Sequence, residues 1–83
     1  MTYSYKTKGT CSTKISFDLD GDQVRNVRYT SGCSGNLQGI GSLVEGMTID
    51  EVISRLSGIK CGVKPTSCPD QLAQALKDVK DKR

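Results

Sequence analysis

Hydrophobic and polar side chains alternate along the first third of the chain, with a period of two that is typical of half-buried β-strands. In residues 12–19, polar side chains separate three apolar residues of the same parity: Ile15, Phe17 and Leu19. Residues 2–6 alternate in the same way around Tyr3 and Tyr5. We therefore expect a strand in each segment, with one face of each strand turned toward a core.

The segment that follows predicts a β-hairpin. Residues 20–22 read Asp-Gly-Asp, a tight-turn sequence between two alternating segments. The next strand is expected over residues 23–31, where the apolar phase changes between Val24 and Val27. Such a change indicates a β-bulge, which we place near residues 25–26. The hairpin and the first strand together predict a three-stranded antiparallel sheet.

After Cys33 the spacing of apolar positions changes from two to the three or four that is typical of α-helices. Residues 34–45 carry four apolar side chains at helical spacing: Leu37, Ile40, Leu43 and Val44. Three glycines weaken the helix propensity of this segment, and their small size allows another backbone or a bound group to approach closely. We expect Gly46 to end the helix.

Two further helices have N-terminal signals. Thr48 and Glu51 have the spacing of a capping box, and the helix that they open is expected to end at Gly58. The last helix is expected to begin at residues 67–70, where Pro69 is tolerated in the first turn and Asp70 complements the helix dipole. Lysine and arginine crowd its C-terminal end, which we expect to be solvated.

These elements predict an α+β fold in which a three-stranded antiparallel sheet is followed by helices packed on one face. The 83 residues form one domain, because two would need more chain. The longest apolar runs are two residues, too short to span a bilayer, and the N-terminal residues lack the apolar core of a secretory signal. We therefore expect a cytoplasmic protein that does not act at a membrane.

Composition excludes several classes of function. The chain has no histidine, which removes the commonest general base and the commonest metal ligand. Its net charge is only +3, and basic and acidic residues interleave, so a nucleic-acid-binding surface is not expected. The remaining candidates for chemistry are the four cysteines: Cys11, Cys33, Cys61 and Cys68.

Four cysteines in so short a chain allow three interpretations. They can form two disulfides, as in exported proteins, although the sequence shows no export signal. They can be buried thiols that pack as small hydrophobic side chains. They can also be the ligands of a four-thiolate site for Zn²⁺ or an iron–sulfur cluster. The chain lacks the double Cys-x-x-Cys spacing, so a metal site would gather its ligands from separate elements.

The strand phases predict that two of the cysteines are neighbours. Cys11 shares parity with Ile15, and Cys33 shares parity with Val27, so both point to the core face if the strands continue that far. With a four-residue loop and one bulge, position 11 lies opposite position 33.

Two cysteines are also predicted at helix N-termini. Cys33 and Cys68 stand there, where the helix dipole favours the thiolate that binds metal. In the metal-free protein we therefore expect an alkylating reagent to modify Cys33 or Cys68 at lower pH than Cys61, which lies in the connector over residues 59–66. A domain of this size has a small stability margin, and a structural zinc ion contributes on the order of 10 kcal/mol in small peptides, which favours the metal interpretation.

Residues 66–70 spell TSCPD, and the chain resembles the TSCPD-domain family, in particular its small stand-alone members with four cysteines. The resemblance covers almost the whole sequence and includes residues 32–37, 44–46 and 59–62. The family includes a C-terminal domain of cobalamin-dependent ribonucleotide reductases, so the resemblance implies an accessory role linked to such a reductase or to another protein. The catalytic barrel of the reductase is not in this sequence, and we expect no enzymatic activity from it alone.

The order of cysteines and elements is also similar to that of the NifU and IscU iron–sulfur scaffolds. The three cysteine ligands of those scaffolds correspond to Cys11, Cys33 and Cys68. Thr13 stands where the scaffolds have an aspartate, Ser67 stands where they have a histidine, and Cys61 has no counterpart. The resemblance implies a scaffold function as an alternative, whereas the fourth cysteine favours a closed site that retains its metal.

The sequence thus predicts a metal-binding accessory domain that holds Zn²⁺ through four thiolates, from Cys11, Cys33, Cys61 and Cys68. The first alternative is an iron–sulfur scaffold, and the second is a protein-interaction module whose thiols are packing residues. The sequence leaves the metal, the partner and the oligomeric state open.

Overall fold

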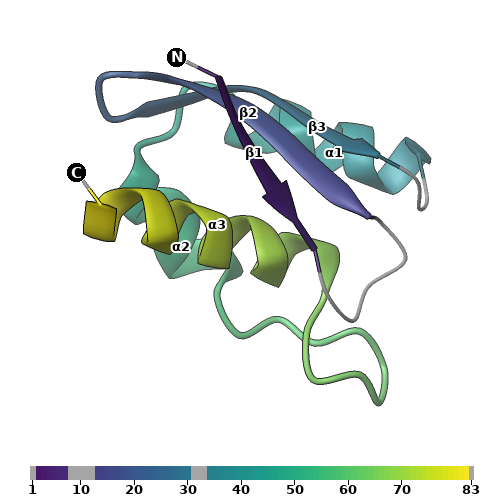
Figure 1. Cartoon of the computed structure of the whole chain (residues 1–83). Helices are drawn as coiled ribbons and strands as arrows, with labels where there is room; N and C mark the ends of the chain where they lie inside the picture. Colours follow the sequence, from purple (N-terminus) through teal and green to yellow (C-terminus); the bar gives the residue numbers. More distant parts are fainter. Residues whose placement is uncertain (1, 8–12, 31–33, 83) are drawn as a thin grey trace.

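Three antiparallel strands form one sheet in the order β1-β2-β3 (Figure 1). The strands are β1 (Thr2–Lys6), β2 (Lys14–Asp20) and β3 (Gln23–Thr30). The structure, a computed structural model, describes residues 2–7, 13–30 and 34–82. Pairing of β1 with β2 places Tyr3 opposite Phe17 and Tyr5 opposite Ile15. The three-stranded antiparallel sheet predicted from the alternation is confirmed.

A β-bulge interrupts the pairing of β2 with β3, as the phase change predicts. Ser16 and Asp18 pair with Arg28 and Arg25, so β3 holds one extra residue at this point. Asn26 lies between those two partners with a φ of 53°, in the left-handed region that asparagine tolerates better than most residues. The bulge accounts for the change in the phase of apolar positions between Val24 and Val27.

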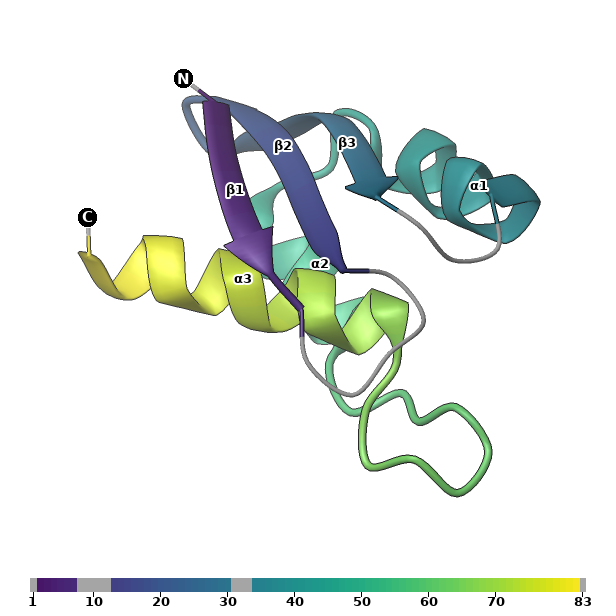
Figure 2. The ribbon, with the colours of Figure 1, turned by 45° about the vertical axis from the view of Figure 1, so that its right-hand side comes forward.

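Three helices follow the sheet: α1 (Ser34–Val44), α2 (Ile49–Leu56) and α3 (Cys68–Lys82). Helices α2 and α3 lie side by side under one face of the sheet, and α1 packs beside β3 (Figures 1 and 2). The predicted capping box opens α2, since Thr48 Oγ1 accepts from the Glu51 N–H at 3.2 Å and a Glu51 carboxylate oxygen accepts from the Thr48 N–H at 3.3 Å. The α+β class is therefore confirmed.

The core lies between the sheet and helices α2 and α3. Its largest fully buried side chains come from both layers: Ile15, Phe17, Val24, Val52, Leu72 and Leu76. The parity of Ile15 and Phe17 in the sequence thus identifies the inner face of β2. None of the helices in the described part of the chain is both long and apolar enough to cross a membrane.

Helix α1 forms despite its glycines, and one of them is required by close packing. A Cβ at Gly41 would lie 2.9 Å from the backbone oxygen of Val27, a distance at which something must shift. The other described glycines inside the helix, Gly35 and Gly39, have open space around them. The expectation that small residues admit another backbone is therefore confirmed at Gly41.

The basic end of α3 is solvated, as the sequence predicts, since Lys77, Lys80 and Lys82 are exposed, and two of these lysines also contact α2. Lys77 donates to Ser57 Oγ at 2.8 Å, and Lys80 forms an ion pair with Asp50. Both contacts join α3 to the end or the first turn of α2. Their strength is modest because the side chains of Lys80 and Asp50 are 55% and 74% exposed.

Candidate functional site

The TSCPD segment forms the N-terminus of α3, where four of its five side chains are buried. Ser67 caps the helix, since its Oγ accepts from the Asp70 N–H at 3.2 Å. The same hydroxyl donates to the Ile59 carbonyl at 2.7 Å, which ties the connector to the helix start. Pro69 occupies the first turn, where an N–H has no partner within the helix. The sequence therefore predicts the helix start correctly, while the bond to Ile59 appears only in the structure.

Asp70 does more than place a negative charge at the N-terminus of the helix dipole. It forms a buried junction, which means that its carboxylate is buried and joins several segments through hydrogen bonds. Its carboxylate accepts hydrogen bonds from Thr66 Oγ1, from the Gly58 N–H at 2.7 Å and from Gln74 Nε2 at 2.8 Å. Burial by itself would raise the pKa of Asp70, but these hydrogen bonds, helped by the charge of Lys77, outweigh it and hold the pKa below its usual value. The carboxylate is therefore charged at neutral pH and anchors the connector at both of its ends.

The connector between α2 and α3 projects from the body of the molecule (Figure 1). A turn shapes its tip, because Lys64 donates its N–H to the Cys61 carbonyl at 3.0 Å and Gly62 has a φ of +59°. The N–H of Cys61 in turn donates to the Thr66 carbonyl at 3.2 Å. The Cys61 side chain is exposed with a free thiol, and Val63 at the tip is fully exposed.

Cys68 has a different environment from Cys61. It is 7% exposed, and its backbone oxygen accepts a hydrogen bond from the Tyr29 hydroxyl at 2.9 Å. Burial, and after it the Cys68 thiol when that group is ionised, raises the pKa of Tyr29 far above its usual value, so the hydroxyl stays protonated and remains a donor. The bond joins the end of β3 to the first turn of α3.

These contacts assemble one end of the molecule. The start of β2 pairs with the end of β3 through Lys14 and Thr30, and Tyr29 joins that end of the sheet to Cys68. Figure 2 shows the end of β1, the start of β2 and the start of α3 on the same side of the molecule. The end of β3, after which the chain leads to residues 31–33, therefore lies against the first turn of α3.

Two of the four predicted ligands, Cys11 and Cys33, lie outside the described residues. Cys61 and Cys68 are not joined to each other by a disulfide. Within residues 2–7, 13–30 and 34–82, no three His, Cys, Asp or Glu side chains are grouped so that they could hold a metal ion. The convergence of all four sulfurs stays a prediction.

The register argument for Cys11 and Cys33 is supported only as far as Lys14. The pairing of Lys14 with Thr30 has the register that would place position 11 opposite position 33. However, the Thr13 N–H also donates to the Thr30 carbonyl at 2.8 Å, a bond that a regular antiparallel ladder in this register does not contain. The regular ladder thus ends at Lys14.

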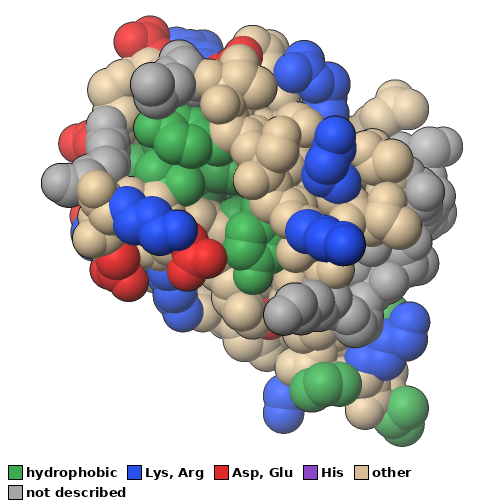
Figure 3. Space-filling model, viewed as in Figure 1, with side chains coloured by type: hydrophobic (Ala, Val, Ile, Leu, Met, Phe, Trp, Pro, Cys, Tyr) green, Lys and Arg blue, Asp and Glu red, His purple; other side chains and the backbone are tan. Residues whose placement is uncertain are grey.

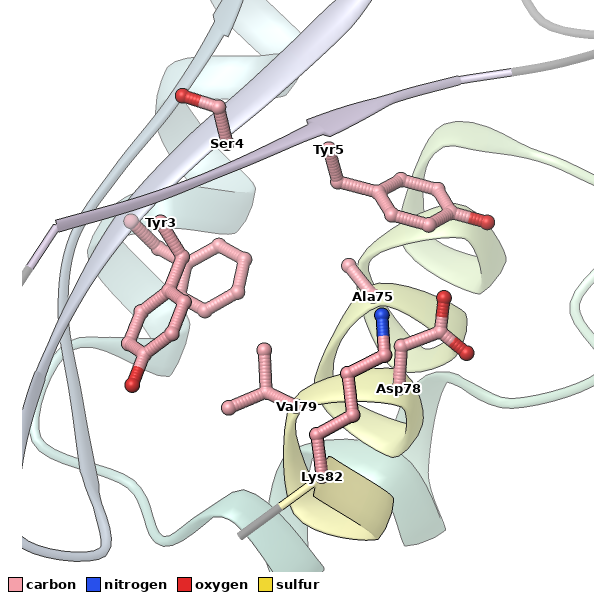
Figure 4. A pocket seen from close by; sticks show the side chains of 8 residues that line it. Tyr3, Ser4, Tyr5, Ala75, Asp78, Val79 and Lys82 are labelled. Atoms are coloured by element: carbon pink, nitrogen blue, oxygen red, sulfur yellow. The ribbon is translucent and has the colours of Figure 1, made fainter.

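A separate groove of about 280 Å³ runs between β1 and α3. Tyr3 and Tyr5 point from β1 toward the helix, and Asp78 and Lys82 lie along the α3 side (Figure 4). Partial burial, with the charges of Asp78 and Asp70, raises the pKa of Tyr5, so its hydroxyl is neutral at physiological pH. Sequence alternation predicted the direction of the two tyrosines but not the groove.

Comparison with known proteins agrees with the sequence pattern. The model of one protein family, described as the TSCPD domain, matches residues 1–80. No match was found among curated proteins or among solved structures, so the likeness to NifU and IscU rests on the order of elements and cysteines. The family match spans nearly the whole length of the chain, and the chain belongs to the TSCPD-domain family.

Proposed function

We propose that the protein is a metal-binding accessory domain that holds Zn²⁺ through four thiolates, from Cys11, Cys33, Cys61 and Cys68. The observation that supports the proposal is the hydrogen bond from Tyr29 to the Cys68 carbonyl. The bond holds the first turn of α3 against the end of β3, after which the chain leads to Cys33. Cys11 precedes the start of β2, which pairs with the same end of β3. A thiol in the first turn of a 15-residue helix is also favoured as a thiolate by the helix dipole.

The connector supports a role for Cys61. Asp70 and Ser67 fix the α2 end of the connector to α3, through Gly58 and Ile59. The exposed thiol of Cys61 has no packing role that ligation would disrupt. Zn²⁺, when bound by four thiolates, would supply a cross-link between elements rather than a reactive centre.

Metal content tests the proposal directly. Protein purified without oxygen should contain close to one zinc per chain and no visible absorption band. Cys61→Ser and Cys68→Ser form a matched pair, and both should lose the metal if the site uses four thiolates. Zinc-free protein whose four thiols are all reduced would contradict the proposal.

An iron–sulfur scaffold that uses Cys11, Cys33 and Cys68 is the second candidate. The exposure of Cys61 at the projecting connector, in contrast to the burial of Cys68, favours a site that does without Cys61. In that case the anaerobic protein should be brown with absorption near about 400 nm, a property of iron–sulfur clusters held by thiolates. Cys61→Ser should then leave the metal content unchanged, whereas Cys68→Ser should abolish it.

The third candidate is an interaction module whose thiols are packing residues, which is supported by the 7% exposure of Cys68. A chelator should then leave the melting temperature unchanged. If zinc is structural, chelation should lower it by many degrees, because about 1 kcal/mol shifts a domain of this size by roughly 4–8 °C.

The cellular role is an extension of the same proposal. We propose that the domain acts in the cytoplasm, where thiols stay reduced and available to metal. Its partner would be a ribonucleotide reductase or another protein, and the domain itself would have no catalytic activity. Copurification of the anaerobic protein with a reductase, lost in Cys68→Ser, is the expected result.

A further inference from the structure

β1 is the open edge of the sheet. The strand order gives β1 one neighbour, β2, and no other strand of the described residues pairs with it. The opposite edge is occupied, because α1 packs beside β3 with Gly41 against the Val27 backbone. An unprotected edge strand presents backbone groups that can pair with another strand.

The hydrogen-bond phase shows which groups of β1 point outward. Thr7 donates its N–H to the Thr13 carbonyl at 3.2 Å, and residues of the same parity, Tyr3 and Tyr5, therefore exchange hydrogen bonds with β2. The same alternation holds on β2. Asp20 pairs with Gln23 at the tight turn, so the backbone groups of Asp20 point toward β3, and those of residues of the opposite parity, such as Phe17, point toward β1. The N–H and C=O groups of every second residue of β1 consequently point away from the sheet: Thr2, Ser4 and Lys6.

We propose that β1 pairs with β1 of a second copy of this chain, antiparallel and with a two-fold axis at Ser4, to form a six-stranded sheet across a homodimer. In this register Ser4 lies opposite Ser4, and Thr2 lies opposite Lys6 in both directions. All the outward backbone groups of the strand are then paired. Registers centred on Tyr3 or Tyr5 leave Lys6 or Thr2 without a partner, and a register centred on Lys6 places two like charges opposite each other.

The side chains of the strand are self-complementary in the same register. Tyr3 of each copy lies opposite Tyr5 of the other, and both tyrosines are on the helix-facing side of the sheet. These are non-hydrogen-bonded positions, where cross-strand side chains approach most closely and aromatic pairs are favourable. The sequence of the strand, TYSYK, thus reads similarly in both directions about Ser4.

The charges beside the strand also suit a two-fold interface. Asp78 and Lys82 stand one turn apart on α3 along the groove next to β1. Figure 3 shows acidic and basic side chains flanking hydrophobic ones on this side of the molecule. With antiparallel copies of α3 on either side of the two-fold axis, Asp78 and Lys82 of both copies lie along the interface, so the α3 side of the interface carries balanced charge.

Sedimentation velocity in reducing buffer, from low micromolar to millimolar protein, tests the proposal. Wild type should show a reversible monomer–dimer equilibrium, weak because strand pairing covers less area than a standard interface. Ser4→Pro removes an N–H that points outward and leaves the bonds to β2 intact, so it should raise the dissociation constant about tenfold or more by removing two symmetry-related hydrogen bonds.

Two further variants keep the result interpretable. Ser4→Lys retains the backbone but sets like charges opposite each other at the axis, and it should also shift the equilibrium to monomer. Ser4→Ala changes neither backbone nor charge and should dimerise like wild type, and circular dichroism should show the native fold in all three variants. A wild-type protein that stays monomeric throughout, or dimers that persist equally in the proline and lysine variants, would overturn the proposal.

Discussion

The carboxylate of Asp70 accepts a hydrogen bond from the backbone N–H of Gly58 at 2.7 Å, across 12 residues of sequence. This contact joins the end of α2 to the start of α3 and closes the connector that carries Cys61. Thr66 and Gln74 bind the same carboxylate, so a single buried charge organises the segment.

Asp70→Asn should destabilise the protein by about 2–3 kcal/mol. The amide replaces an ionised acceptor with a neutral group that can accept through only one atom, and hydrogen bonds to charged groups contribute more than neutral ones. The free energy of unfolding from urea denaturation measures the effect. Asp81→Asn, on the exposed end of the same helix, is the control and should change stability little. Equal effects of the two substitutions would show that the buried junction is unimportant.

Two glycines of α1 should respond to alanine in opposite directions. At Gly41 the added Cβ would lie 2.9 Å from the Val27 oxygen, so Gly41→Ala should force the helix away from β3 and destabilise the protein. At Gly39 the added Cβ meets open space, and Gly39→Ala should stabilise by up to about 1 kcal/mol through helix propensity. Thermal unfolding of both variants checks the pair, and a stabilising Gly41→Ala would contradict the close approach.

Cys61 should react with a small alkylating reagent before Cys68 in the metal-free folded protein. The position of Cys68 at a helix N-terminus led to the opposite expectation, but its sulfur lies in a residue that is 7% exposed. A reagent must reach the sulfur, so burial outweighs the dipole in setting the order. Peptide mapping by mass spectrometry after brief labelling measures this order. Unfolding in urea should remove the difference between the two thiols, and faster labelling of Cys68 in the folded state would show that the dipole dominates.

Stability in acid should depend partly on Asp18. Hydrogen bonds from Thr2 Oγ1 at 2.6 Å and Asn26 Nδ2 at 2.9 Å lower the pKa of Asp18 below its usual value. A pKa that is lower in the folded state adds stability above the unfolded-state value of about 3.9, and this stability is lost as the pH falls below it. The contribution is modest because solvent surrounds the carboxylate.

The Asp18→Asn variant isolates that contribution. Its free energy of unfolding should fall less steeply than that of wild type between about pH 4 and pH 2, because the group that titrates is gone. Asp20→Asn, at the end of β2 beside the tight turn, serves as the comparison and should follow the wild-type curve more closely. Parallel acid profiles for wild type and Asp18→Asn would rule out the proposed linkage.

The sequence by itself determined the elements and the inward faces of the sheet. Alternation identified Ile15 and Phe17 as core residues, and the phase change after Val24 located the bulge. The capping box at Thr48 and the helix start at Ser67 were also predicted correctly. All of these features depend on residues only a few positions apart, whose geometry is fixed by strand and helix periods and by local caps.

The tertiary structure alone decided how those elements meet. The sequence could not distinguish a carboxylate at the helix dipole from the buried junction that Asp70 forms, because Gly58 and Asp70 are brought together by the packing of α2 on α3. It could not show that Gly41, and not its neighbouring glycines, faces Val27. The contrast between exposed Cys61 and buried Cys68 has the same origin. Periodicity determines which side of an element is apolar, but long-range packing determines which atoms that side contacts and which thiols solvent can reach.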